Sequence, residues 1–294
     1  MRCLWTVGVR AALSIALSIL VVAAPHSAVA YNPATLTCPA DSVKVGTTCV
    51  DKYEASVWQI DPSNTTLVKL VQKGKVTLAD LTAAGATQVG CAYPPFNQPA
   101  VPANFPDSGQ WTPIPGSNPP SPGVYAVSVA GVLPSPCLGW FQASQACALS
   151  GKRLITNREW QDAAAGTPDP GLADNGSTTC ATNSAGPVAT GSRASCKSNW
   201  GVYDMVGNVW EWAGDWEDHA SPSGCATDWT TQTGIPGADL SCFGGDGSAG
   251  VYQIPGSLSR GGRWDSGTDA GVFAVGGGSD PNVLSASHGF RCAR

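Results

Sequence analysis

Apolar residues recur at helical spacing in two adjacent stretches near the middle of the chain. Residues 140–151 place their apolar side chains on one helical face, and Gly151 is typical of a helix C-cap. The following stretch has Thr156 three residues before Glu159, which is the spacing of a capping box. The pattern therefore predicts two successive helices, the second over about 157–165.

Weaker patterns lie on either side of these helices. Residues 77–84 begin with a threonine and carry an acid in the first turn, which predicts a short helix. Apolar and polar residues alternate only in part over 49–58. This mixed pattern predicts a strand that runs into a short helix. From Thr179 onward we expect short strands and turns, with the glycine runs 244–250 and 276–278 as loops. Neither run has the strand before it and helix after it that a phosphate-binding loop requires.

Composition favours a loop-rich α+β protein. The 294 residues include 35 Gly and 23 Pro, 43% are hydrophobic and only 13% are charged. Proline and glycine concentrate in the insertion of about residues 91–137, which is either a structured loop or a linker between two domains. The net charge of −5 offers no basic surface for nucleic acid, so we expect no nucleic-acid partner.

The first thirty residues have the pattern of a signal peptide. Arg2 and Arg10 give a positively charged N-terminal region, and an apolar run over 11–24 follows it. Residues 28–30 form an A-x-A cleavage site. A membrane anchor is the alternative, but the run is shorter than the ~20 residues that span a bilayer. We therefore expect residues 1–30 to be removed and the domain of residues 31–294 to be exported, periplasmic or secreted, with no transmembrane segment.

The cysteine count agrees with export. Of eleven cysteines, Cys3 leaves with the signal peptide, and the remaining even number suggests disulfides. A zinc site is disfavoured, because there is no C-x-x-C and the mature chain holds only His219 and His288. Cys147 and Cys292 have no partner nearby in the sequence. Spacing suggests four local pairs: Cys38 with Cys49, Cys91 with Cys137, Cys180 with Cys196, and Cys225 with Cys242.

Three phrases in the last third of the chain carry a family resemblance. They are GVYDMVGNVWEWAGDWED at 201–218, LSRGGRW at 258–264 and GFRCAR at 289–294. The chain resembles the formylglycine-generating-enzyme, or sulfatase-modifying-factor, family. The resemblance implies one domain with an α+β, C-type-lectin-like fold, loop-rich with short strands and a few helices. It also implies a long-range disulfide between Cys147, before GKRL, and Cys292, in GFRC.

The resemblance implies a calcium site in the first of these phrases. Carried over by position, Asp204 and Glu211 supply carboxylates, and Gly207 and Val209 supply main-chain oxygens. Calcium prefers six to eight hard oxygen ligands, which such a set begins to provide. The alternative is that Asp204 caps a turn and Glu211 pairs with a surface base.

The family's copper chemistry is not expected. The positions of the two redox-active cysteines are Ser266 and Gly271, and no cysteine lies between Cys242 and Cys292. Copper(I) prefers thiolate ligands, which neither residue offers. The iron-dependent branch of the family uses several histidines and is also disfavoured. The alternative function is nevertheless an enzyme: a formylglycine-generating oxidase or a related periplasmic maturation enzyme.

The segment between residues 265 and 288 sets small polar residues among apolar anchors. It resembles the variable region of diversity-generating-retroelement target proteins, although an ordinary polar loop has the same composition. Nothing orients Ser266, His288 and Asp265 as a catalytic triad. We therefore predict a monomeric binding module for a protein or glycan ligand. The predicted contact residues are Arg263, Trp264, Asp265, Ser266, Thr268, Asp269, Asn282 and His288.

Overall fold

The computed structural model describes residues 36–218, 225–226, 241–242 and 255–294. All of them belong to one compact unit, Pro33–Arg294. The predicted signal peptide lies outside the described residues. No helix in the described ranges is long and apolar enough to cross a membrane.

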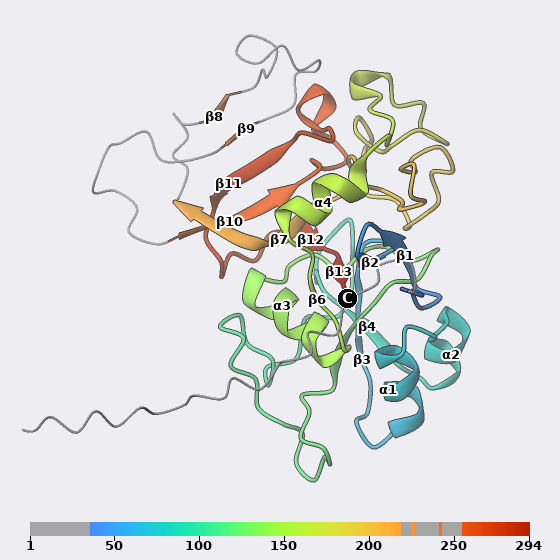
Figure 1. Cartoon of the computed structure of the whole chain (residues 1–294). Helices are drawn as coiled ribbons and strands as arrows, with labels where there is room; N and C mark the ends of the chain where they lie inside the picture. Colours follow the sequence, from blue (N-terminus) through green and yellow to red (C-terminus); the bar gives the residue numbers. More distant parts are fainter. Residues whose placement is uncertain (1–35, 219–224, 227–240, 243–254) are drawn as a thin grey trace, which may run out of the picture. The chain divides into compact units, whose positions relative to one another are not determined.

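The chain's C-terminus is held inside a four-stranded sheet of order β1-β2-β13-β6 (Figure 1). β1 (Ser42–Val45) and β2 (Thr48–Asp51) form an antiparallel hairpin. β13 (Cys292–Ala293) pairs with β2 on one side and with β6 (Arg153–Leu154) on the other. The first and last described strands are therefore parts of the same sheet.

A second sheet carries the sequence phrases that resemble the family. Its strand order is β12-β7-β10-β11-β9-β8. The long strand β7 pairs antiparallel with β10 and parallel with β12, so the three phrases lie side by side. The bounds are β7 (Trp210–Asp218), β8 (Cys225–Ala226), β9 (Ser241–Cys242), β10 (Pro255–Arg260), β11 (Val275–Ser279) and β12 (His288–Phe290).

The third sheet contains a strand from the proline-rich insertion. β3 (Ser56–Gln59) pairs antiparallel with β4 (Thr87–Val89) and with β5 (Val124–Val127). Because β5 joins a sheet with an earlier strand, residues 91–137 are not a linker between two domains. Helices α1 (Thr65–Gln72) and α2 (Leu78–Ala83) connect β3 to β4.

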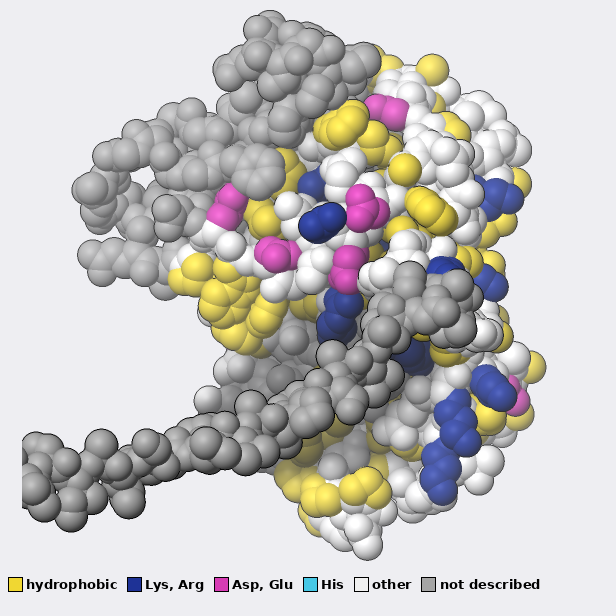
Figure 2. Space-filling model, in the orientation of Figure 1, with side chains coloured by type: hydrophobic (Ala, Val, Ile, Leu, Met, Phe, Trp, Pro, Cys, Tyr) yellow, Lys and Arg dark blue, Asp and Glu magenta, His cyan; other side chains and the backbone are white. Residues whose placement is uncertain are grey.

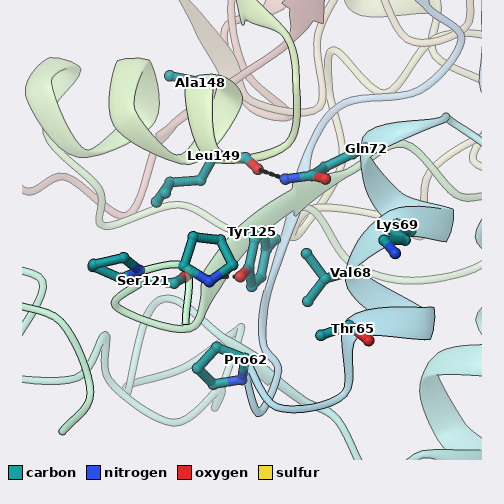
Figure 3. Close-up of a pocket in the computed structure, with 11 residues that line it drawn as sticks. Pro62, Thr65, Val68, Lys69, Gln72, Ser121, Tyr125, Ala148 and Leu149 are labelled. Atoms are coloured by element: carbon teal, nitrogen blue, oxygen red, sulfur yellow. Dashed lines mark hydrogen bonds between the residues drawn. The ribbon is translucent and has the colours of Figure 1, made fainter. Parts of the chain in front are cut away.

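Helix α1 lies beside the insertion and carries Lys69, with Lys73 and Lys75 just after its end. In Figure 2, dark-blue side chains prevail around α1, whereas acidic and basic side chains are mixed around α4. Between α1, the insertion and β5 lies a cavity of about 330 Å³ (Figure 3).

Two helices pack on the sheets as the sequence pattern predicts. α3 (Trp140–Leu149) is followed by Gly151 at φ +68°, and α4 (Asn157–Ala164) begins with a capping box between Thr156 and Glu159. The core around them is aromatic and fully enclosed, and it includes Trp160, Trp212, Phe290, Phe105 and Leu138.

Four predicted disulfides are present: Cys38–Cys49, Cys91–Cys137, Cys180–Cys196 and the long-range Cys147–Cys292. In the fifth predicted pair, Cys225 lies opposite Cys242 in the antiparallel register of β8 and β9. The side chains of that pair lie outside what the structure describes, so its bond stays a prediction.

Two sequence predictions of local structure were wrong. The stretch 49–58 contains the strands β2 and β3 and no helix, because both strands are buried in sheets. Residues 276–278 lie inside β11 and are not a loop, since pairing with β10 and β9 overrides the poor strand propensity of glycine. The run 244–250 lies outside the described residues.

The long-range disulfide predicts a large stability difference. Cys147–Cys292 spans 145 residues of sequence and Cys38–Cys49 spans 11. In the chain-entropy model the double substitution Cys147→Ala/Cys292→Ala costs ~5 kcal/mol, and Cys38→Ala/Cys49→Ala costs ~3 kcal/mol. Denaturant unfolding of both variants measures this. Equal losses of unfolding free energy in the two variants, or a larger loss in the variant without Cys38–Cys49, would contradict the prediction.

Candidate functional site

The two glycines of RGG turn the chain sharply at the end of β10. Gly261 and Gly262 have φ of +90° and +85°, where other residues are strained. A Cβ on Gly262 would lie 2.6 Å from Ala270, so the turn also packs too closely for a side chain. This turn takes the chain out of the sheet at the segment that was predicted to contact a ligand.

The predicted contact residues after RGG lie on one surface turn. The exposed Asp265 forms an ion pair with the half-exposed Arg263 at 2.5 Å, and Thr268 is exposed beside them. The turn is closed by Ser266, whose hydroxyl accepts the backbone N–H of Arg263 at 3.0 Å. Asp269 ends the short 3-10 helix η4 (Gly267–Asp269) and is partly buried.

Trp264 anchors this turn to the body of the domain. Its ring packs edge-to-face on Phe96, with ring centroids 6.1 Å apart. Its backbone N–H donates to the carbonyl oxygen of Asn208 at 3.0 Å, and its carbonyl accepts the N–H of Ser184 at 2.6 Å. Trp264 is only partly exposed, so it holds the turn in place as well as contributing to the surface.

His288 is only partly exposed, and its ring packs against aromatic side chains. Its ring stacks on Trp212 at 4.5 Å between centroids, and Nδ1 lies 3.1 Å from the Ser287 hydroxyl. Burial, with the nearby positive charge of Arg263, lowers the pKa of His288 to about 3. The imidazole is therefore neutral at physiological pH.

The two positions of the family's copper cysteines have structural roles here. The Ser266 hydroxyl is engaged in the turn, and Gly271 is a buried glycine whose N–H donates to the Gly261 carbonyl at 3.2 Å. All eight cysteines whose side chains the structure describes belong to disulfides. None of these eight offers a free thiol.

One exposed residue beside the turn escaped the sequence analysis. Leu172, in the 3-10 turn η2 (Gly171–Ala173), is 66% exposed. A Cβ on Gly267 would come within 2.8 Å of the Leu172 side chain, so the two turns touch. Sequence offered no signal for this, because the contact joins residues nearly a hundred positions apart. Asn282, by contrast, is exposed on a separate loop beside Gly139.

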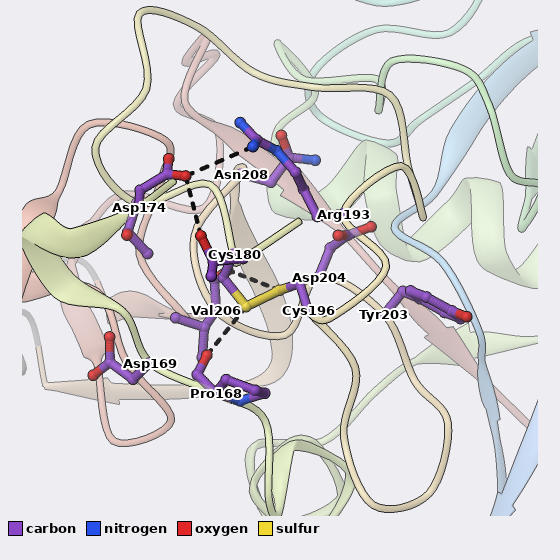
Figure 4. Close-up of a disulfide and its surroundings, with 12 residues drawn as sticks. Pro168, Asp169, Asp174, Cys180, Arg193, Cys196, Tyr203, Asp204, Val206 and Asn208 are labelled. Carbon is purple, nitrogen blue, oxygen red and sulfur yellow. Dashed lines mark hydrogen bonds and ion pairs between the residues drawn. A yellow bond between two sulfur atoms is a disulfide. The ribbon is translucent and has the colours of Figure 1, made fainter. Parts of the chain in front are cut away.

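Polar contacts of Asp174 hold the loop that carries Leu172. Arg193 lies 3.7 Å from Asp174, and the Asp174 carboxylate also accepts the Ser184 hydroxyl at 2.5 Å. Figure 4 shows this pair beside the Cys180–Cys196 disulfide. The loop is therefore held in one conformation.

Asn208 connects the surface turn to a buried ionic cluster. Its side-chain N–H group donates to Glu54, which is fully buried. The carboxylate of Glu211 accepts Nε of Arg291 at 3.0 Å, Nη2 of Arg291 at 2.6 Å and the indole N–H of Trp160 at 2.8 Å. Arg291 is itself fully buried, so Glu211 pairs with a buried base, whereas the alternative reading expected a base at the surface.

Acidic side chains outnumber basic ones in this cluster. Glu54, Asp204 and Glu211 are buried carboxylates, and Arg291 is the fully buried cation among them. Burial raises the pKa of Asp204 to about 7, although the Gly191 N–H and Arg291 oppose the rise. Burial, together with the charges of Asp204 and Glu211, raises the pKa of Glu54 well above its ordinary value.

The predicted calcium ligands fit a cation in charge and donor type. Oδ2 of Asp204 accepts a hydrogen bond from the Gly191 N–H at 2.7 Å. Oε1 of Glu211 accepts one hydrogen bond and keeps a second lone pair. Gly207 and Val209 lie on the turn between the two carboxylates. The described residues contain no group of three or more His, Cys, Asp or Glu side chains that could hold a metal, so carbonyls must complete the set.

The raised pKa of Asp204 predicts a pH dependence of stability. Between pH 3.8, its ordinary pKa, and about 7, the folded protein keeps a proton that the unfolded chain releases. The free energy of unfolding contributed by this group therefore falls as pH rises through that window. With chelator present, Asp204→Asn should flatten the profile, and the exposed Asp107→Asn should not. Urea unfolding at several pH values measures this, and an unchanged slope in Asp204→Asn would contradict it.

Curated relatives match about half of the chain. The serine/threonine-protein kinase Pkn1 of Chlamydia trachomatis is 29% identical over 161 residues, which is 53% of this chain and 23% of the relative. The Pkn1 of Chlamydia caviae is 30% identical over 173 residues, with the same coverage. The chain thus spans less than a quarter of the length of these relatives.

Solved structures match between about half and most of the chain. The P3c variant of Major Tropism Determinant is 18% identical, with a TM-score of 0.43 over 87% of this chain and 54% of that one. The U1 variant is 25% identical, with a TM-score of 0.35 over 53% of this chain and 37% of that one. PvdO from Pseudomonas aeruginosa is 17% identical, with a TM-score of 0.33 over 86% and 82%.

A family model matches residues 23–294, nearly the whole chain. The matched description is the sulfatase-modifying factor enzyme 1-like domain. It agrees with the three phrases on β7, β10 and β12 and with the α+β, C-type-lectin-like fold that they implied. The chain belongs to the sulfatase-modifying factor enzyme 1-like domain family.

Proposed function

We propose that this domain is an exported binding module that presents the turn after RGG to a protein or glycan ligand. One observation carries the proposal: the positions of the catalytic cysteines are a serine engaged in that turn and a buried glycine. The same turn exposes Arg263, Asp265 and Thr268. The scaffold is therefore kept while the residues for copper chemistry are absent.

The surface has the composition of an adaptable contact. Arginine and tryptophan are frequent anchors of binding, and small polar residues around them provide adaptable hydrogen bonds. Leu172 adds an exposed apolar side chain next to Gly267. Because both turns are fixed by hydrogen bonds, little conformational entropy is lost when a ligand binds.

Export is supported by the disulfides. Four bridges form within the described residues, and such bridges persist in oxidising compartments. The alternative function, a formylglycine-generating oxidase or maturation enzyme, would need thiols from elsewhere in the chain. The eight cysteines whose side chains the structure describes supply none, because all of them are paired.

Calcium is part of the proposal as a structural ion. Asp204 and Glu211 would hold it with the carbonyl oxygens of Gly207 and Val209. The ion would supply the positive charge that balances the cluster. Arg291 and Trp160 orient Glu211, and the Gly191 N–H orients Asp204.

The absence of oxidase activity is directly testable. The mature protein, supplied with copper and oxygen, should leave the cysteine of a sulfatase-type peptide unmodified, because Ser266 and Gly271 cannot bind copper(I). Mass spectrometry of the peptide measures this, with a copper-loaded active oxidase as positive control. Formylglycine formed by this protein would place the enzyme alternative first.

Ligand contact should depend on the exposed turn. Labelled domain applied to arrays of glycans and of purified cell-surface proteins should bind specific members. The double variant Arg263→Ala/Asp265→Ala should lose that binding by roughly tenfold or more, since such anchors contribute over ~1 kcal/mol each. The exposed pair Lys73→Ala/Asp61→Ala is the matched control. Equal binding by both variants would contradict the assigned surface.

Calcium should raise the melting temperature of the mature protein. An ion at ~100 times its dissociation constant adds ~2.7 kcal/mol of stability. Asp204→Asn should abolish the difference between calcium and chelator, and magnesium should not replace calcium, since it demands a smaller octahedral site. Coincident melts of the wild type in calcium and in chelator would rule the site out.

A further inference from the structure

The cavity beside α1 is separate in sequence and structure from the site described above. It has a volume of about 330 Å³, which suits a small molecule. Its walls come from α1, the proline-rich insertion, β5 and the end of α3. The lining residues are Pro62, Thr65, Val68, Lys69, Gln72, Pro119, Pro120, Ser121, Tyr125, Ala148 and Leu149.

Two buried hydroxyl groups on the wall leave one proton without an acceptor. Tyr125 and Ser121 are 2% and 5% exposed, and their hydroxyl oxygens lie 2.8 Å apart. The Ser121 oxygen also accepts the N–H of Gly123 at 3.1 Å. Together the two hydroxyl groups have two protons, and one of these lies in the hydrogen bond between their oxygens. For the other, the described residues offer no acceptor, so a ligand can accept it.

The hydroxyl of Tyr125 stays protonated under ordinary conditions. Burial raises its pKa above the ordinary value of 10.0, although the bond with Ser121 opposes the rise. The pair therefore remains a donor across the physiological range. Figure 3 shows Tyr125 and Ser121 together, facing Val68 across the cavity.

The charge beside the cavity is positive. The exposed Lys69 of α1 lines it, and no ion pair of Lys69 occurs within the described ranges. Lys73 and Lys75 are exposed just after it, and dark-blue side chains prevail over this part of the surface (Figure 2). A negatively charged acceptor suits this environment better than a neutral or cationic group.

The remaining walls are mainly apolar, with Thr65 and Gln72 as their polar residues. Pro62, Pro119 and Pro120 supply three rings, and Val68 and Leu149 supply branched side chains. Such walls favour a compact apolar body, since they offer it few hydrogen bonds. We propose that this cavity binds a small amphipathic carboxylate, with its apolar body between the prolines and its carboxylate toward the hydroxyl pair and Lys69.

A matched pair of probes tests the charge and the shape together. Phenylacetate and phenethylamine have similar apolar bodies and opposite charges. Titration of the ¹⁵N-labelled mature domain, followed by ¹H–¹⁵N spectra, should show phenylacetate binding roughly tenfold more tightly than phenethylamine. The shifted amides should include those of Lys69, Ser121 and Tyr125.

Variants separate the hydroxyl pair from the surface charge. Tyr125→Phe alone leaves the Ser121 hydroxyl as a donor, whereas Tyr125→Phe/Ser121→Ala removes both hydroxyls. The double variant should weaken phenylacetate by roughly tenfold or more, as expected for a lost hydrogen bond to a charged acceptor. Lys69→Gln should weaken it by a smaller factor. Lys75→Gln, at an exposed lysine outside the lining, is the control and should leave the affinity unchanged.

Three outcomes overturn the proposal. They are no shifts at millimolar phenylacetate, equal binding of both probes, or shifts that map away from the cavity. An unchanged affinity in Tyr125→Phe/Ser121→Ala also overturns it, provided that this variant keeps the wild-type spectrum elsewhere. None of these results bears on the turn after RGG, because the two sites share no residue.

Discussion

The buried ion pair between Arg291 and Glu211 is the interaction on which the rest of the structure depends. Both side chains are almost completely enclosed, and their charged atoms lie 2.6 Å apart. Arg291 also donates to the backbone carbonyl oxygens of Asp51 and Tyr203. The pair therefore joins β7, the C-terminal segment, the end of β2 and the loop before β7. A buried charge is tolerated only when its partners are all in place, so these segments must assemble together.

The surface turn inherits its position from this cluster. Glu54 accepts hydrogen bonds from the side chain of Asn208 and the backbone of Val209. The carbonyl oxygen of Asn208 in turn accepts the N–H of Trp264. A chain of hydrogen bonds thus runs from the buried carboxylates to the exposed turn. The family scaffold can lose its redox residues and still present a fixed surface, because the cluster and not the cysteines positions the turn.

Local sequence signals predicted the elements whose ends are set by local chemistry. Two helix ends were predicted in this way: the start of α4 from the capping box of Thr156 and Glu159, and the end of α3 from the glycine after it. Both signals act within a few residues. The motif phrases predicted the long-range disulfide of Cys147. The strand β11 over a glycine run was missed, since its pairing partners lie far away in sequence.

The candidate site was predictable in part. The turn from Arg263 to Thr268 followed from the family phrase, and its Asp265 and Thr268 are exposed. The stacking of His288 on Trp212 and the exposed Leu172 next to the turn could not be read from sequence, because both result from packing between distant segments. The pairing of Glu211 with the buried Arg291 was also not predicted, since the sequence analysis considered only a surface base.

The central claim is that Arg291 and Glu211 stabilise the fold as a unit. A double-mutant cycle with Arg291→Met and Glu211→Gln, measured by urea unfolding in chelator, tests it most directly. Each single substitution should lower the free energy of unfolding by about 3–5 kcal/mol, because it leaves the buried partner unpaired. The double variant should lose less than the sum, with a coupling of about 2–3 kcal/mol. Additive losses would contradict the account, since the two charges would then act independently.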